Sequence, residues 1–172
     1  MSARRLSLAG ALALALPSGG CSFHPLYGRA EANAAGQQVF HSIYVEPIAA
    51  ERAGFELRDS LMDLLAGADK PDHALYRLNV TVRQTVEGIA VQTNASITRY
   101  NYTLIADYEL TDIHSGASIT KGIEKTVSAY DVVASPYATL VAQQTAQKLG
   151  AHDIADRIRI DLGVYFSKHA GG

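Results

Sequence analysis

The alternation of apolar and polar residues divides most of the chain into six segments with a regular period. A period of two predicts half-buried strands over residues 39–48, 74–86, 97–113 and 117–130. Apolar residues spaced three and four apart predict helices over residues 51–67 and 137–166. The order strand, helix, three strands, helix predicts an α+β two-layer sandwich, with two helices packed on one face of a mostly antiparallel four-stranded sheet.

Each predicted strand places one set of alternate residues on a shared face. In the first two strands these are Val39, His41, Ile43 and Val45, then Tyr76, Leu78, Val80 and Val82. In the third strand they are Tyr100, Tyr102, Leu104, Ala106, Tyr108 and Leu110. In the fourth strand Ile119, Ile123, Val127 and Ala129 share their face with Lys121 and Lys125. Residues 112–118, which include Gly116, predict a hairpin turn between the last two strands.

Both predicted helices have an apolar stripe and recognisable ends. In the first helix the stripe is Leu57, Leu61, Leu64 and Leu65, and Gly67 and Pro71 are expected to end it. In the second helix the stripe is Leu149, Ile154, Ile158 and Leu162. Ser135 is expected to cap this helix, with Pro136 in its first turn. Gly150 is expected to bend or interrupt it.

The first 20 residues have the pattern of a secretory signal peptide. Arg4 and Arg5 precede the apolar run 6–16, and the small residues Ser18, Gly19 and Gly20 follow it. Eleven apolar residues are too few to span a bilayer, which needs about 20. A buried N-terminal helix is the alternative interpretation. We expect cleavage between Gly20 and Cys21.

Cys21 is the only cysteine, so it has no partner for a disulfide within the chain. Its place directly after two glycines resembles the lipid acceptor of a bacterial lipoprotein signal. The alternative is an inert buried thiol. These patterns predict a lipoprotein signal peptide over 1–20, a lipidated N-terminus and tether over 21–38, and a single α+β domain over 39–168.

Composition and charge exclude several classes of function. From Cys21 onward the chain keeps 13 basic and 17 acidic residues, a net charge of −4, which argues against general nucleic-acid binding. The six histidines are scattered over different segments without metal-ligand spacing. No nucleophile motif or phosphate-binding glycine loop occurs, and Ser135 is explained as a helix cap. We therefore expect no enzyme, no metal and no cofactor.

Basic residues on the predicted strands are a candidate binding feature. They are Arg77, Arg83, Arg99, Lys121 and Lys125. Together they could give neighbouring strands a local basic patch that binds phosphate groups. The alternative is that they are ordinary face charges that limit aggregation.

Several short motifs together resemble the alphaproteobacterial form of the LptE family of lipopolysaccharide-assembly lipoproteins. The motifs are CSFHPLY over residues 21–27, Ile43-x-Val45-x-Pro47-Ile48, Arg52-x-Gly54-x-x-Leu57-Arg58-x-x-Leu61, Arg99-Tyr100, Ala106-x-Tyr108-x-Leu110, Ala129-Tyr130 and Ser135-Pro136-Tyr137-Ala138. The resemblance covers nearly the whole chain after Cys21, and the family's fold agrees with the segment order predicted from periodicity.

The resemblance implies a function that composition alone does not. Members of this family are anchored in the outer membrane on its periplasmic side and plug a β-barrel translocon, LptD, that delivers lipopolysaccharide to the cell surface. Ser22 is compatible with sorting to that membrane. Contacts with lipopolysaccharide phosphates would fall first to Arg99, then to Lys121 and Lys125. The alternative function is a lipoprotein accessory subunit of a lipid-transporting ABC system.

Overall fold

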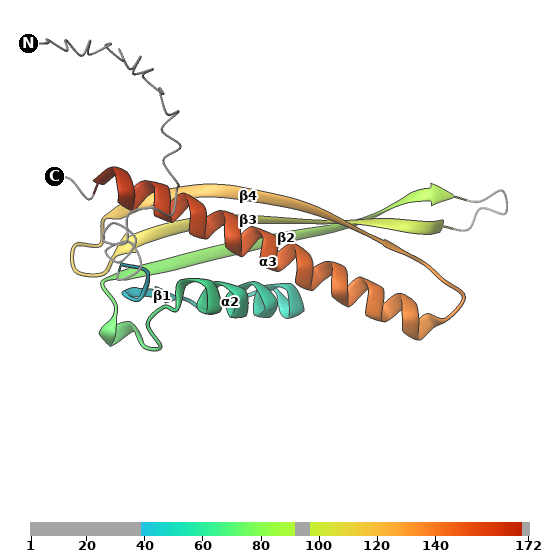
Figure 1. Cartoon of the computed structure of the whole chain (residues 1–172), viewed down its shortest axis with the longest axis horizontal. Coiled ribbons are helices and arrows are strands. Elements are labelled where there is room, and N and C mark those ends of the chain that lie inside the picture. Colours follow the sequence, from blue (N-terminus) through green and yellow to red (C-terminus); the bar gives the residue numbers. More distant parts are fainter. Residues whose placement is uncertain (1–38, 92–96, 170–172) are drawn as a thin grey trace, which may run out of the picture.

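The computed structural model describes residues 39–91 and 97–169, and it confirms the predicted α+β fold (Figure 1). The elements are β1 (Ile43–Val45), α2 (Glu51–Leu65), a short 3-10 helix (Pro71–His73), β2 (Tyr76–Val91), β3 (Ile97–Asp112), β4 (Ser118–Asp131) and α3 (Pro136–His169). The sheet order is β1-β2-β3-β4, with β1 parallel to β2 and the other pairs antiparallel. The expected signal peptide, the cleavage site at Gly20 and Cys21, the lipidation site and the tether all lie outside the described residues.

The long strands β2 and β3 carry the centre of the core. Their register pairs Leu78 with Leu110 and Val80 with Tyr108, so the even-numbered residues of both strands share one face. Leu78, Leu104 and Leu110 on that face are fully buried. The predicted core faces of β2 and β3 are therefore confirmed. Both helices cover this face, which leaves the odd-numbered residues on an open face.

The first strand is much shorter than predicted. Residues 39 and 40 are helical and residues 41–42 form a turn, in which the Ser42 N–H and hydroxyl both donate to the Val39 carbonyl, at 3.0 and 2.7 Å. This turn takes His41 off the predicted face and exposes it, with Nδ1 donating to the Ala66 carbonyl at 2.7 Å. Only Ile43 and Val45 remain as the buried face of β1. The placement of Val39 and His41 on one face with them was wrong, because local hydrogen bonds outweigh a weak alternation.

The helix α2 buries the stripe Ala53, Leu57, Leu61 and Leu65, whereas Leu64 is only partly buried. It ends at Leu65, two residues before the expected glycine, because Ala66 adopts the left-handed conformation with φ of 44°. Gly67 instead lies against the Ile43 carbonyl, where a Cβ atom would collide with backbone. The residue that was expected to end the helix thus permits a close approach between α2 and β1.

The helix α3 runs without interruption for 34 residues, about 50 Å. Ser135 caps it as predicted, since its hydroxyl accepts from the Ala138 N–H at 3.4 Å. The expected interruption at Gly150 was wrong, because the helix continues through this residue. A Cβ atom there would lie 3.3 Å from Thr126 Cγ2 and 3.5 Å from Ser128 Oγ, so this glycine lets the helix lie against β4.

Leu149 was also wrongly placed on the buried stripe. It precedes Ile154 by five residues, about 140° around the helix axis, and it is 61% exposed. The buried stripe follows a four-residue spacing through Ala146, Gly150, Ile154, Ile158 and Leu162.

The hairpin turn between β3 and β4 forms as predicted. Gly116 has φ of +69°, a conformation that side chains other than glycine rarely adopt. The Asp112 carboxylate accepts from the Ser115 N–H at 2.7 Å and from the Ser115 hydroxyl at 2.9 Å. These hydrogen bonds lower the pKa of Asp112 and fix the turn.

Candidate functional site

The candidate functional surface is the open face of the sheet, defined by the odd-numbered residues 77–87 of β2, 99–111 of β3 and 121–131 of β4. It is mostly polar and carries all five of the basic residues singled out in the sequence. Polar residues reach this face because each strand alternates, and the even positions of its central part pack beneath the helices. The open face is therefore suited to contact with another molecule across its surface.

Three of its arginines are paired with carboxylates. Arg83 Nη2 lies 2.8 Å from Asp107 Oδ2, and Arg99 Nη1 lies 3.1 Å from Asp131 Oδ1. Arg77 Nε lies 3.4 Å from Glu46 Oε1. All three pairs are solvent-exposed, so each contributes only about 0–1 kcal/mol to folding. Such pairs can therefore exchange partners at little cost.

The structure does not gather the three predicted lipopolysaccharide contacts into one cluster. Arg99 lies opposite Asp131, and Lys121 lies opposite Glu109, ten positions further along β3. That separation corresponds to about 33 Å along the strand. Lys125 lies four positions from Lys121, about 13 Å away. Within the described ranges, neither lysine forms an ion pair.

Two exposed apolar residues interrupt the polar character of the open face. Ile123 is 64% exposed and Val127 is 53% exposed, and both alternate with Lys121 and Lys125 on β4 as the sequence predicts. Thr103 lies opposite Val127, and Asp107 lies opposite Ile123. The β4 side of this surface therefore combines apolar and cationic side chains.

Comparison of the sequence with models of known protein families identifies the family of this chain. The family model described as LptE, lipopolysaccharide-assembly, matches residues 40–162. The chain belongs to the LptE family. The match begins in the turn before β1 and ends within α3, so it includes every strand of the open face.

Solved structures with a similar fold agree with membership of the LptE family. A candidate lipoprotein from Caulobacter crescentus CB15 has 27% sequence identity and a TM-score of 0.66, covering 78% of this chain and 97% of its own. Rare lipoprotein B from Shewanella oneidensis has 12% identity and a TM-score of 0.53, covering 72% and 92%. A minor lipoprotein from Acinetobacter baumannii has 14% identity and a TM-score of 0.51, covering 72% and 92%. The last two show the shared fold alone. No curated protein sequence gives a significant match.

Two further observations concern metal binding and membrane-spanning helices in this LptE-family chain. Among residues 39–91 and 97–169, no three His, Cys, Asp or Glu side chains are grouped so that they could bind a metal ion. None of the helices in the same ranges is both long and apolar enough to cross a membrane.

The LptE-family chain also has a polar cluster between α3 and the sheet, which sequence reasoning missed. The Tyr108 hydroxyl donates to Asp161 Oδ2 at 2.9 Å, and Glu124 of β4 lies beside the same carboxylate. Gly122 makes room for the Tyr108 ring, since a Cβ atom there would lie 2.7 Å from it. The sequence did contain one signal of this cluster: Gly122 and Glu124 lie two residues apart, both at even positions of β4 that face the helices.

Burial and the negative neighbour shift the ionisation of this cluster. Burial raises the pKa of Glu124 above its ordinary 4.5, and the charge of Asp161 and a hydrogen bond with it raise the pKa further. Arg157 acts in the opposite direction and Asp153 in the same one. Burial and the Asp161 hydrogen bond likewise raise the pKa of Tyr108, which therefore stays protonated as a donor.

Replacing Glu124 with glutamine is expected to change how stability depends on pH. Because the folded pKa lies above 4.5, the wild-type contribution is fully present below pH 4.5 and is lost as pH rises through the folded value. Glu124→Gln removes this loss. As pH rises, the free energy of unfolding of the variant should therefore increase relative to that of the wild type, by about 0.5 kcal/mol because water screens the site. Urea unfolding at pH 4 and pH 8 measures the difference. A difference that stays constant across this range would contradict the assignment.

Proposed function

We propose that the protein is an outer-membrane lipoprotein that plugs an LptD-like β-barrel and assists the assembly and delivery of lipopolysaccharide. The observation that carries this proposal is the LptE-family match over residues 40–162, a family of lipopolysaccharide assembly. The proposal includes a signal peptide over 1–20, a lipid on Cys21, a tether over 21–38, and a domain over 39–168 that acts by binding without catalysis.

The open face supports the plug role on physical grounds. The interior of a large outer-membrane barrel is polar and wet. A plug inside it needs polar side chains whose hydrogen bonds are satisfied with or without the partner. Arg83 with Asp107 and Arg99 with Asp131 meet this requirement, because each pair is exposed and already satisfied. Ile123 and Val127 add apolar contact area to the same face.

Extraction in mild detergent tests this function. The mature protein should co-purify with a β-barrel of much larger mass, in a constant ratio through size exclusion. Recovery of inner-membrane transporter subunits in place of a barrel would support the accessory role in a lipid-transporting ABC system. Recovery of the lipoprotein alone from correctly assembled outer membranes would contradict the plug role.

Arg99 is the first candidate for a contact with lipopolysaccharide phosphate, followed by Lys121 and Lys125. Its guanidinium is about half exposed and its only ion-pair partner in the described residues is Asp131. A phosphate can replace a surface carboxylate because guanidinium pairs with either in the same forked geometry. The spacing of Arg99 from the two lysines means that one phosphate group cannot contact all three.

Arg99→Ala is expected to weaken lipopolysaccharide binding about ten-fold, the effect of losing one hydrogen bond to a charged group. Arg157→Ala is the matched control, because Arg157 forms a similarly exposed pair with Asp153 at 3.2 Å on α3. Binding measured with purified lipopolysaccharide should be unchanged in the control. Equal affinities for Arg99→Ala and the wild type would return Arg99 to the role of an ordinary face charge.

A further inference from the structure

A groove runs between the outer edge of β4 and the first half of α3. Its volume is about 640 Å³. Ala138, Ala142, Ala146 and Leu149 line it from α3, and Ala129 and Tyr130 line it from β4. The small side chains of α3 recur every four residues, so they form one continuous apolar wall.

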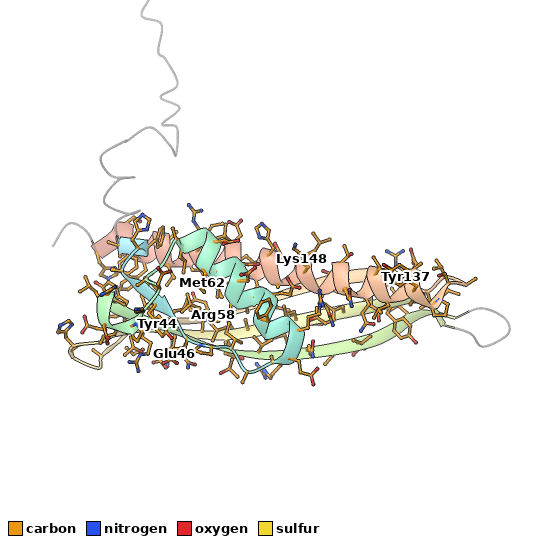
Figure 2. All side chains as sticks on the ribbon, turned by 90° about the horizontal axis from the view of Figure 1, so that it is seen from below. Tyr44, Glu46, Arg58, Met62, Tyr137 and Lys148 are labelled. Atoms are coloured by element: carbon orange, nitrogen blue, oxygen red, sulfur yellow. The ribbon has the colours of Figure 1, made fainter. Side chains whose placement is uncertain are left out.

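The groove is uncovered in the described part of the chain. The helix α2 lies beside the C-terminal half of α3 and does not reach this end (Figure 1). Tyr137, 75% exposed, lies beyond the span of α2 (Figure 2). Because β4 is the last strand in the sheet order, its outer backbone N–H and C=O groups have no strand partner among residues 39–91 and 97–169. Edges of this kind are normally covered or blocked.

The chain preceding Val39 can reach this groove. Phe40 lies at the C-terminal half of α3, where its ring is 3.5 Å from the Cβ position of Gly163. Arg159 stacks over the same ring, with its Cζ atom 5.8 Å from the ring centre. From Gly163 to Leu149 is 14 residues of helix, about 21 Å. Residues 28–38 span about 36 Å when extended, which is enough to reach Leu149 and continue to Ala142.

The composition of the same stretch selects which residues would occupy the groove. Between Cys21 and Gln38 the large apolar residues are Phe23, Leu26 and Tyr27, and the rest of the stretch after Gly28 is small or polar. Only residues 23–27 therefore gain appreciably from burial. Pro25 suits the outermost strand of a sheet, because it lacks an N–H group and stops further pairing.

We propose that residues 23–27 lie in this groove, antiparallel to β4, with Phe23 and Tyr27 packed against the alanines of α3. The segment extends the sheet by one short strand and covers its free edge. It also holds Cys21 near the N-terminal end of α3, which fixes the orientation of the domain relative to its lipid. This inference does not depend on a barrel partner or on lipopolysaccharide binding.

Disulfide cross-linking in the chain from residue 21, with Cys21 changed to serine, tests the proposal. The pair Tyr27→Cys and Ala142→Cys should form an intramolecular disulfide in most molecules under mild oxidation, because bonding needs Cα atoms within about 7 Å. The control pair Tyr27→Cys and Lys125→Cys places the second thiol on the open face and should form several-fold less. Equal yields in the two pairs, or disulfides formed only between copies, would overturn the proposal.

Hydrogen exchange provides a second measurement without introduced thiols. Amides of residues 127–133 should exchange at least about ten-fold more slowly in the protein with the unmodified segment than in the variant Phe23→Ser with Tyr27→Ser, the factor expected from burying one large apolar side chain. The variant should still unfold in one cooperative transition, at a temperature lowered by only the few degrees that loss of this contact implies. Protection that appears only when phospholipid vesicles are added would assign the segment to the membrane surface and overturn the proposal.

Discussion

Replacing Cys21 with alanine is expected to release nearly all of the protein from the membrane fraction. Under the proposed function, Cys21 carries several acyl chains, and each buried methylene contributes about 0.8 kcal/mol to membrane binding. Losing all of them removes the anchor completely. Fractionation of cells that express the variant in large excess over any barrel partner, which would itself retain the protein, followed by detection of the protein in soluble and membrane fractions, measures the effect. Ser22→Ala is the matched control, because it keeps the cysteine.

The same substitution should leave the folded domain unchanged. Cys21 lies 22 residues before β1, so the free energy of unfolding of the released protein should match that of the wild type within about 0.5 kcal/mol. Membrane retention that is unchanged in Cys21→Ala, with normal processing of the signal peptide, would contradict the lipidation of this residue.

Leu104→Ala is expected to lower the free energy of unfolding by about 3–4 kcal/mol. Leu104 is fully buried at the centre of β3, between Gln84 of β2 and Thr126 of β4. Removing its side chain loses transfer free energy and leaves a cavity that surrounding strands cannot fill. Urea unfolding measures this decrease in the free energy of unfolding, with the same slope against urea concentration used for both proteins.

Ile123→Ala provides the matched comparison for this core substitution. Ile123 is also a large aliphatic residue in the same sheet, but it is 64% exposed on the open face. Its replacement should cost less than about 1 kcal/mol, because little of its side chain leaves water on folding. Comparable losses for the two variants would mean that the helices do not cover the face assigned to them.

The sequence predicts the fold well wherever one side of an element is buried along its whole length. Apolar even-numbered residues alternate with polar odd-numbered residues along most of β3, so the sequence alone identified the buried face of this strand. The region before β1 was mispredicted because a turn held by Ser42 and Val39 leaves no periodic signal. Gly150 was mispredicted because a glycine that ends a helix and a glycine that admits a neighbouring strand look the same in one sequence.

The candidate site was less predictable than the fold. The alternation placed Arg99, Lys121 and Lys125 on one face, but only the register of β3 and β4 shows their spacing and the pairing of Arg99 with Asp131. The cluster of Tyr108, Glu124 and Asp161 joins residues up to 53 positions apart, which periodicity within a segment cannot bring together. The lipid site at Cys21 is a prediction from the sequence and lies outside the described residues.

Cross-linking from the open face in intact outer membranes tests the central claim most directly. A photoreactive amino acid at position 123 projects from β4 on the open face, where Ile123 is largely exposed. The plug role predicts an adduct whose mass is that of this protein plus a large outer-membrane β-barrel, formed only after illumination. Correctly anchored protein that yields no such adduct, or that cross-links to inner-membrane transporter subunits, would contradict it.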